Sequence, residues 1–219
     1  MKVVWRHKGF SSDDLSLLGT LGSVLPALEE LILCESAAGP DGVQRLAEKL
    51  GAAALPAVTC LGLGDMHVGD AGASALAAAL GRGAMPRLKR LALHDTAIGD
   101  AGLVALAPAL RRRPALEYLD LDGNPFGDDG LAAFVAPPLP VRPAGAPPPP
   151  TGRLAKLKVL SLTNTKVADS GCAALAAALD SGALPALERL NLFGIPASAA
   201  AMKVVVLAKM AQDAARGRN

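Results

Sequence analysis

Leucines recur along the chain in a regular frame. The second leucines of successive L-x-L pairs are 30, 30, 28, 41 and 30 residues apart. These second leucines are Leu33, Leu63, Leu93, Leu121, Leu162 and Leu192. The segment Val3-Val4-Trp5 fits the same frame ahead of them. A period this regular predicts a solenoid, here with six clear repeats and one partial repeat.

Each repeat changes its hydrophobic period halfway along. The first half alternates apolar and polar residues, as at Leu91 and Leu93, which predicts a short strand with its leucines on one face. The second half has apolar residues at helical spacing and predicts a helix. We expect each helix to begin at a side chain that accepts hydrogen bonds from the first turn. These predicted N-caps are Ser12, Asp70, Asp100, Asp128 and Asp169.

A glycine lies in the first turn of most of the predicted helices. Because glycine lowers helix propensity, its presence there indicates a steric need, and we expect each helix start to pack closely against a neighbouring coil. The glycines are Gly42, Gly72, Gly102, Gly130 and Gly171. The helices are rich in alanine and therefore thin, so stacked repeats should curve with the strands on the inner side.

The pattern L-x-x-L-x-L followed by a helix resembles the leucine-rich repeats of the ribonuclease-inhibitor type, over roughly residues 3 to 210. The resemblance implies an α/β fold: a curved solenoid, or right-handed β-α superhelix, with parallel strands on the concave face and helices on the convex face. Relatives in this class include repeat domains of NOD-like receptors, Ran GTPase-activating proteins and tropomodulin-like actin regulators.

One position departs from the pattern of this class. This position usually holds an asparagine or cysteine whose side chain forms hydrogen bonds with the loop backbone of neighbouring repeats. Asn124 is the one asparagine at this position here. The position reads Ser36, Met66, Thr96, Asn124, Thr165 and Ile195. Serine and threonine can replace part of the hydrogen-bond ladder, whereas methionine and isoleucine cannot. We therefore expect the turn at Met66 and Ile195 either to be held by packing or to be looser.

Composition indicates a single leucine-rich repeat domain over residues 1–219. The chain is 51% hydrophobic but 3% aromatic, which suits one elongated core of leucine, alanine and valine. The net charge of +2, from 22 basic and 20 acidic residues, gives no footprint for nucleic acid or an acidic membrane. The basic run Arg111-Arg112-Arg113 falls at a predicted helix end, where positive charge is favourable; a phosphate or acidic-partner site is the alternative.

Cysteine usage and the termini predict a cytoplasmic protein. Cys34, Cys60 and Cys172 are odd in number and lack paired spacing, unlike disulfide-capped secreted repeats. The start MKVVWRHK lacks the apolar stretch of a signal peptide, and no apolar window is long enough to span a membrane. No polar capping unit precedes the first strand, which suggests a fragment of a longer array; a final helix from about residue 197 to 215, started by Pro196, would be a modest cap.

The 41-residue gap in the frame contains a proline-rich insertion at residues 137–152. Its prolines must leave the helix, so we expect a looped-out segment after a shortened helix. Pro137, Pro140 and Arg142 resemble a ligand of SH3 domains, because two prolines fit apolar grooves and the arginine meets an acidic pocket. A proline-rich loop also matches such a loose pattern by chance.

The outward positions of the strands are the candidate protein-binding surface. These side chains should stand in rows on the concave face, with a shallow gap at Gly62 and Gly64. Tyr118 and Phe193 are candidate aromatic anchors, and Arg90 and Arg189 are candidate charged contacts. The full candidate set is Glu30, Arg90, His94, Tyr118, Asp120, Asp122, Arg189, Asn191 and Phe193.

Carboxylates and a histidine on adjacent repeats admit a second interpretation. A metal or acid–base site is conceivable, but on an open surface an acidic patch for a basic partner is the simpler interpretation. The residues concerned are Asp65, His94, Asp95, Asp120 and Asp122.

We therefore expect a non-enzymatic scaffold, without a cofactor, that binds a protein through its concave face. Two alternatives stay open from the resemblance. The first is a GTPase activator of the Ran type, which rests on fold analogy alone. The second is a repeat fragment, such as the sensor region of a larger NOD-like receptor or part of an actin-regulatory or axonemal protein.

Overall fold

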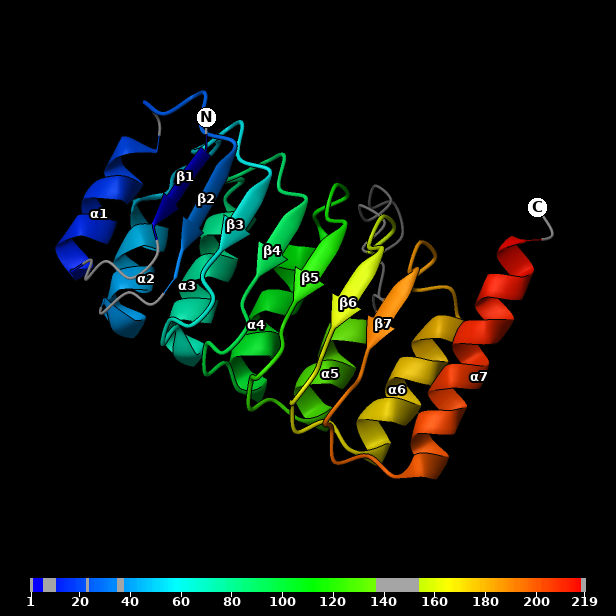
Figure 1. Ribbon diagram of the computed structural model, residues 1–219. Helices are drawn as coiled ribbons and strands as arrows, with labels where there is room; N and C mark the ends of the chain where they lie inside the picture. The colour runs from blue at the N-terminus through cyan, green and yellow to red at the C-terminus, as the bar shows by residue number, and fades with distance from the viewer. Residues whose placement is uncertain (1, 6–10, 23, 35–37, 137–153, 218–219) are drawn as a thin grey trace, which may run out of the picture.

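The computed structural model describes residues 2–5, 11–22, 24–34, 38–136 and 154–217. Within these residues seven parallel strands form one sheet in chain order (Figure 1). They are β1 (Lys2–Trp5), β2 (Glu30–Leu33), β3 (Cys60–Gly62), β4 (Arg90–Ala92), β5 (Tyr118–Asp120), β6 (Val159–Ser161) and β7 (Arg189–Asn191). The predicted α/β solenoid is confirmed, and the partial first repeat contains both a strand and a helix.

A helix follows each strand, and all of these helices lie on the same face of the sheet (Figure 1). The helices are α1 (Ser12–Leu21), α2 (Gly39–Lys49), α3 (Gly69–Gly81), α4 (Asp100–Arg111), α5 (Asp128–Val135), α6 (Asp169–Asp180) and α7 (Ala199–Arg216). Each helix packs against the helices of adjacent repeats. Strands and helices thus form two layers, with the strands on the concave face.

The strand leucines pair in register across the sheet. Leu61 pairs with Leu91, and Leu119 pairs with Leu160, so one row of leucines runs from strand to strand. These side chains are almost completely buried against the helices, in one continuous core. Because side chains alternate along a strand, the residues between the leucines face away from the core. The register therefore fixes which residues form the concave surface.

The aspartates at the helix starts cap the helix of the following repeat. The Oδ1 atom of Asp100 accepts hydrogen bonds from the backbone N–H groups of Gly127 and Gly130, both at 2.8 Å. Asp70 bonds Gly99 and Gly102 in the same way, at 2.7 and 3.0 Å. The prediction that each aspartate caps its own helix was wrong, because α4, α5 and α6 begin at the aspartate itself, whose side chain reaches the adjacent coil.

The same arrangement recurs at the two later interfaces. Asp128 accepts from Ala168 N–H at 2.7 Å, and Asp169 accepts from Ser198 N–H at 2.6 Å and from its hydroxyl at 2.8 Å. Helix α1 is capped within itself, since Ser11 and Asp14 form a reciprocal capping box. The cap there is thus Ser11, one residue before the predicted Ser12.

Three of the first-turn glycines leave room for these aspartates. A Cβ added at Gly102 would lie 2.6 Å from Asp70 Oδ1, and one at Gly130 would lie 2.7 Å from Asp100 Oδ1. Both distances are well below van der Waals contact. The predicted close packing is confirmed. At Gly102, Gly130 and Gly171 its cause is a carboxylate from the preceding repeat, whereas at Gly42 and Gly72 it is an apolar side chain.

Arginines satisfy the opposite ends of the helices. Arg82 donates to the carbonyls of Ala47 and Leu50 at the end of α2, at 2.8 and 3.2 Å. Arg111 donates to Ala133 and Phe134 at the end of α5, at 2.6 and 3.3 Å. The last carbonyls of a helix lack an intrahelical partner; here the Ala47 carbonyl also accepts from the Leu50 N–H at 3.2 Å. The helix-end interpretation of the basic run is therefore confirmed for Arg111.

The other two residues of the basic run differ from each other. Arg113 is buried and donates to the carbonyls of Leu80 and Met85 in the preceding repeat. Arg112 is exposed.

The segments flanking the last repeats agree only partly with expectation. Helix α5 has eight residues and is shortened as predicted, but the insertion at 137–152, including Pro137, Pro140 and Arg142, lies outside the described residues. Helix α7 begins at Ala199, later than predicted, because the Ser198 hydroxyl caps it by accepting from Ala201 N–H at 3.2 Å. None of the helices in the described part of the chain has the length and apolar character needed to cross a bilayer.

Replacing Asp100 with alanine should destabilise the protein by about 1 to 2 kcal/mol, because two helix N–H groups lose their acceptor. Urea unfolding measures the change. Asp129→Ala is the matched control: Asp129 is exposed and lies in the first turn of α5. It should change stability by less than about 0.5 kcal/mol. Equal unfolding midpoints for the two variants would contradict inter-repeat capping.

Acid should weaken the contact of α7 with α6. The backbone N–H of Ser198, followed by its hydroxyl, lowers the pKa of the Asp169 carboxyl. A lowered folded-state pKa stabilises above the unfolded value of about 3.9, and this stabilisation is lost as the pH falls through the folded pKa. The stability difference between the wild type and Asp169→Ala should therefore be complete near neutral pH and shrink below about pH 4. A difference that does not change between these pH values would refute the role of the carboxylate.

Candidate functional site

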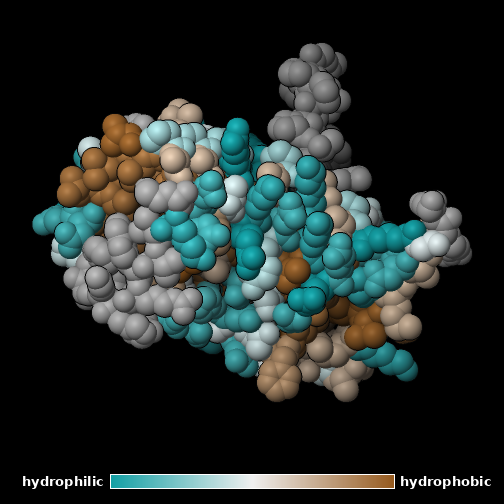
Figure 2. Space-filling model, turned by 45° about the horizontal axis from the view of Figure 1, so that its top comes forward, coloured by the Kyte–Doolittle hydropathy of each residue, from teal (hydrophilic) through white to brown (hydrophobic). Residues whose placement is uncertain are grey.

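On the face shown in Figure 2, polar residues cover the middle, whereas hydrophobic residues gather toward both ends of the row of repeats. The exposed apolar side chains near α1 are Leu17, Leu21 and Val24. Those at the last repeat are Phe193, Val204, Val206, Leu207 and Met210. The central part of the concave face therefore offers the mixed polar surface.

A hollow of about 330 Å³ interrupts the concave face between β2 and β5. It is lined by Ile32, Cys34, Cys60, Gly62, Asp65, Arg90, Ala92, His94, Tyr118 and Asp120. Gly62 and Ala92 form its floor, because glycine has no side chain and that of alanine is a single methyl group. The imidazole of His94 lies over Gly64, where an added Cβ would be 2.1 Å from His94 Cε1. The predicted gap is therefore present at Gly62, whereas at Gly64 the imidazole of His94 fills the space.

One wall of the hollow is a stacked pair. The register places Arg90 opposite Tyr118, and the Arg90 guanidinium carbon lies 4.9 Å from the centre of the tyrosine ring. This cation–π contact contributes about 0.5–1 kcal/mol at an exposed site. Burial and the nearby Asp120 carboxylate raise the pKa of the Tyr118 hydroxyl. The two side chains, predicted as separate contacts, therefore form one unit.

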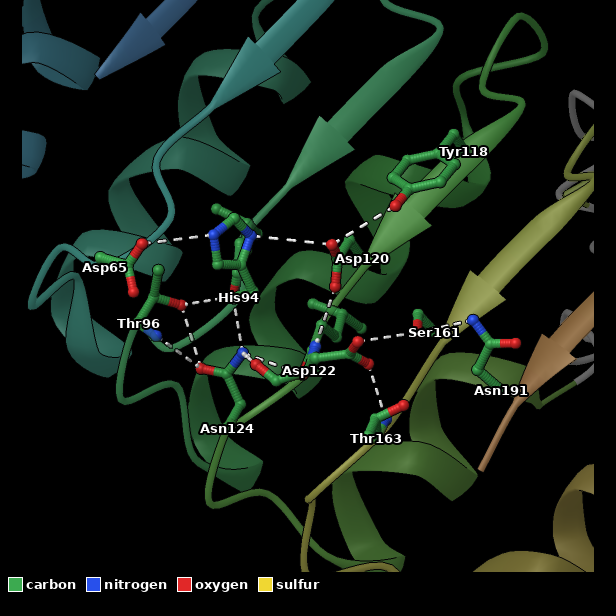
Figure 3. A network of polar contacts seen from close by, with 12 residues as sticks. Asp65, His94, Thr96, Tyr118, Asp120, Asp122, Asn124, Ser161, Thr163 and Asn191 are labelled. Atoms are coloured by element: carbon green, nitrogen blue, oxygen red, sulfur yellow. Dashed lines mark hydrogen bonds and ion pairs between the residues drawn. The ribbon is translucent and has the colours of Figure 1, made fainter. Parts of the chain in front are cut away.

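Next to this pair, a histidine lies between two carboxylates (Figure 3). His94 Nε2 lies 3.5 Å from Asp65 Oδ2, and His94 Nδ1 lies 3.6 Å from Asp120 Oδ2. These distances suit ion pairs but are long for hydrogen bonds. Within the described residues, Nδ1 is buried and has no hydrogen-bond partner. Burial raises the pKa of Asp120, although the Asp122 N–H bonded to its carboxylate acts in the opposite direction.

From Asp120 the polar contacts continue across the sheet to β7 (Figure 3). Asp122 donates its N–H to Asp120 Oδ1 at 3.1 Å. The Asp122 carboxylate accepts from the Ser161 hydroxyl at 2.9 Å and from Thr163 N–H at 2.6 Å. Asn191 then donates to Ser161 Oγ at 3.2 Å. Together with the contacts of His94 to Asp65 and Asp120, this network joins five consecutive repeats, from that of β3 to that of β7.

The candidate residues divide into two groups. Arg90, His94, Tyr118, Asp120, Asp122 and Asn191 belong to the hollow or to this network. Glu30 forms an ion pair with Lys2 at 2.6 Å, and Arg189 is exposed on β7. Phe193 is 80% exposed beside a separate apolar groove between β7 and α7, so the two predicted aromatic anchors do not share a site.

Ser161 and Thr163 were not among the candidate residues. Their signal was present in the sequence, because Ser161 occupies the same outward register position as Asp120. Asp95, grouped with the other carboxylates, instead lies in the turn after β4 and sits over Gly123 of the next repeat. In the part of the chain that the structure describes, no group of three or more histidine, cysteine or acidic side chains is arranged to hold a metal ion.

Asn124 holds the turns beneath this site (Figure 3). Its amide donates to the carbonyls of Leu93 and Leu121 at 2.6 and 3.0 Å, and its Oδ1 accepts from Ile98 N–H at 2.9 Å and from the Thr96 hydroxyl at 3.0 Å. The asparagine thereby fixes its own repeat to the preceding one.

The other ladder positions agree with expectation. Thr96 and Thr165 each donate a hydroxyl to a backbone carbonyl of their own turn, at 2.8 and 2.9 Å, so threonine replaces part of the ladder. Met66 is fully buried and Ile195 is half-buried, which fits turns held by packing. Ser36 lies outside the described residues.

Comparisons with known proteins agree with this architecture. The family described as Leucine Rich repeat matches residues 85–107, 114–135 and 153–176. The solved structure of leiomodin-1 actin-binding site 2 is 14% identical, with a TM-score of 0.51, over 96% of this chain and 94% of that chain. The tropomodulin C-terminal domain from Caenorhabditis elegans is 12% identical, with a TM-score of 0.50, over 95% and 96%. No curated protein matches the sequence. At these identities the similarity to solved structures concerns the fold alone.

Replacing Asn124 with alanine should cost about 2 to 4 kcal/mol of stability, because buried backbone groups of two repeats lose their partner. Chemical denaturation measures the loss. Asn191→Ala is a suitable control, since this asparagine is exposed on the same sheet and makes one side-chain hydrogen bond. Its stability should change by less than about 0.5 kcal/mol. A similar loss in both variants would show that the ladder position has no special role.

Proposed function

Because the chain is a leucine-rich repeat protein of the ribonuclease-inhibitor type, we propose that it binds another protein through its concave face, with the hollow between β2 and β5 at the centre of the contact. A binding role fits the open shape of this face, which offers a broad surface of outward side chains. We also propose an intracellular location, because the three cysteines are odd in number and lack the paired spacing of a disulfide framework.

The composition of the hollow supports this choice. Arginine and tyrosine are enriched among the residues that dominate binding energies at interfaces. Arg90 and Tyr118 stand together at the edge of the hollow, each already held by the other. Side chains that are ordered before binding lose less conformational entropy when a partner arrives. This stacked pair is the observation that carries the proposal.

The surrounding network supports the same surface. Hydrogen bonds from Asp120 through Asp122 and Ser161 link the outward side chains of neighbouring strands. Such links hold the recognition groups at fixed spacings on a rigid scaffold. A partner would therefore meet a preformed surface.

Actin is a specific partner to test. Among the similar solved structures, one is described as an actin-binding site and another is a tropomodulin domain. The proposed site in this chain does not depend on that choice. The GTPase-activator alternative rests on the class resemblance alone.

The test is capture of partners from a cell extract by the wild type, Arg90→Glu and Tyr118→Ala, with identification by mass spectrometry. Each substitution should weaken the affinity of a concave-face partner by at least about tenfold, or about 1.4 kcal/mol. Purified actin is measured in parallel. Arg112→Glu changes the same charge at an exposed helix end and should bind like the wild type. If both concave-face variants retain every partner at unchanged affinity, the concave face is not the binding surface.

A further inference from the structure

The last strand in the row, β7, has an open edge (Figure 1). Earlier repeats bond the next repeat in a constant way, through the N–H of the second leucine. Leu121 N–H donates to the Ser161 carbonyl, and Leu162 N–H donates to the Asn191 carbonyl, both at 3.0 Å. Leu192 holds the equivalent position directly after β7, and its N–H has no acceptor among the described residues.

Two more backbone groups are open at the same edge. Asn164 N–H donates to the following repeat at 2.8 Å, and the Lys158 carbonyl accepts from Glu188 N–H at 2.8 Å. The equivalent groups one repeat later are the Gly194 N–H and the Glu188 carbonyl, and no described residue bonds either of them. These two groups and the Leu192 N–H are called the outer edge of β7 below. Unpaired groups in such a row are a template for a further strand.

An apolar groove of about 540 Å³ lies behind the outer edge, between β7 and α7. Leu190 and Leu192 line its strand side, and Val205 and Val206 line its helix side. Leu190 is half-buried, whereas Leu160, which pairs with it across the sheet, is completely buried. The groove is therefore the space that the leucines of the next strand fill in the earlier repeats.

The helix side of this end does not continue the array in the same way. Lys209 holds the position on α7 that the buried Leu179 holds on α6, and its ammonium pairs with Asp213 at 2.5 and 2.6 Å. A further repeat helix packed here would bury this ion pair, which has a desolvation cost, where the core has a leucine. Ala199 also stands at the position from which Asp169 caps the next helix. The open end thus suits an added strand better than an added strand and helix.

We propose that β7 binds an extended segment of a protein partner, which adds a parallel strand at the outer edge and places two alternate leucines or similar side chains in the groove. Main-chain hydrogen bonds supply affinity in this mode of binding, and the side-chain pockets supply specificity. The proposal goes beyond the concave-face function, because this surface lies at the last repeat and the hollow lies between β2 and β5.

The test uses a labelled peptide with the sequence of residues 88–96, LKRLALHDT, titrated with the full chain and followed by fluorescence anisotropy. This segment contains β4, which already pairs in the required register with β3. The unmodified peptide should bind. A peptide with aspartate in place of Leu91 and Leu93 should bind at least about tenfold more weakly, because it has no apolar side chains for the groove.

A second modified peptide tests the backbone pairing alone. In the intact chain the N–H groups of Lys89 and Arg90 both donate to the Thr59 carbonyl, the equivalent of the Glu188 carbonyl at the outer edge. N-methylation of these two amides keeps every side chain and should also weaken binding by at least about tenfold. No binding of the unmodified peptide at up to about 1 mM chain, or equal binding of the three peptides, would overturn the proposal.

Variants of the chain locate the binding surface. Val206→Glu adds a charge to the groove and should weaken binding of the unmodified peptide by at least about tenfold. Val104→Glu is the matched control, because Val104 on α4 is 46% exposed and Val206 is 51% exposed; it should change affinity by less than about twofold. Arg90→Glu alters the hollow and should leave peptide binding unchanged. Equal losses in the two glutamate variants of valine would refute the groove as the site.

Sedimentation of the chain alone decides between a partner's segment and a second copy. The proposal expects a monomer that binds the unmodified peptide. Self-association that the peptide displaces and that Val206→Glu abolishes would assign the outer edge to a second copy of the chain and overturn the proposal.

Discussion

Capping between repeats is the constraint on which the rest of the structure depends. A helix leaves backbone N–H groups without partners at its start and carbonyls without partners at its end. In this chain, aspartates such as Asp100 satisfy the starts and arginines such as Arg82 satisfy the ends, each from an adjacent repeat. The charges have the sign that favours each end of the helix dipole. A repeat is therefore incomplete without its neighbours, beyond its need to bury leucines.

Regular stacking on the helix side makes irregular features on the strand side possible. The leucine register and Asn124 hold the backbone in place whatever side chains point outward. Gly62 can thus leave a space on the concave face without loosening the core, and Arg90 can stack on a tyrosine one repeat away. The recognition surface varies on a scaffold whose stability is supplied elsewhere.

Sequence reasoning predicted the periodic part of this structure well. Leucine spacing predicted the strands, the helices and the outward rows, and strand register brought His94 between Asp65 and Asp120. It assigned the capping aspartates to the wrong helix, because linear spacing does not say whether a side chain turns toward its own helix or the next. It also separated Arg90 from Tyr118, since the stacking of two long side chains depends on rotamers that a pattern does not encode.

The bond between Asp128 and Ala168 spans 40 residues of sequence, whereas the equivalent bond between Asp100 and Gly127 spans 27. Both are short, at 2.7 and 2.8 Å, although the first encloses the proline-rich insertion. Extra chain at this position adds length without adding distance between the repeats. The junction after α5 therefore accommodates extra chain without any change in the contact between the flanking repeats, and a reporter or tag could be inserted there on the same principle.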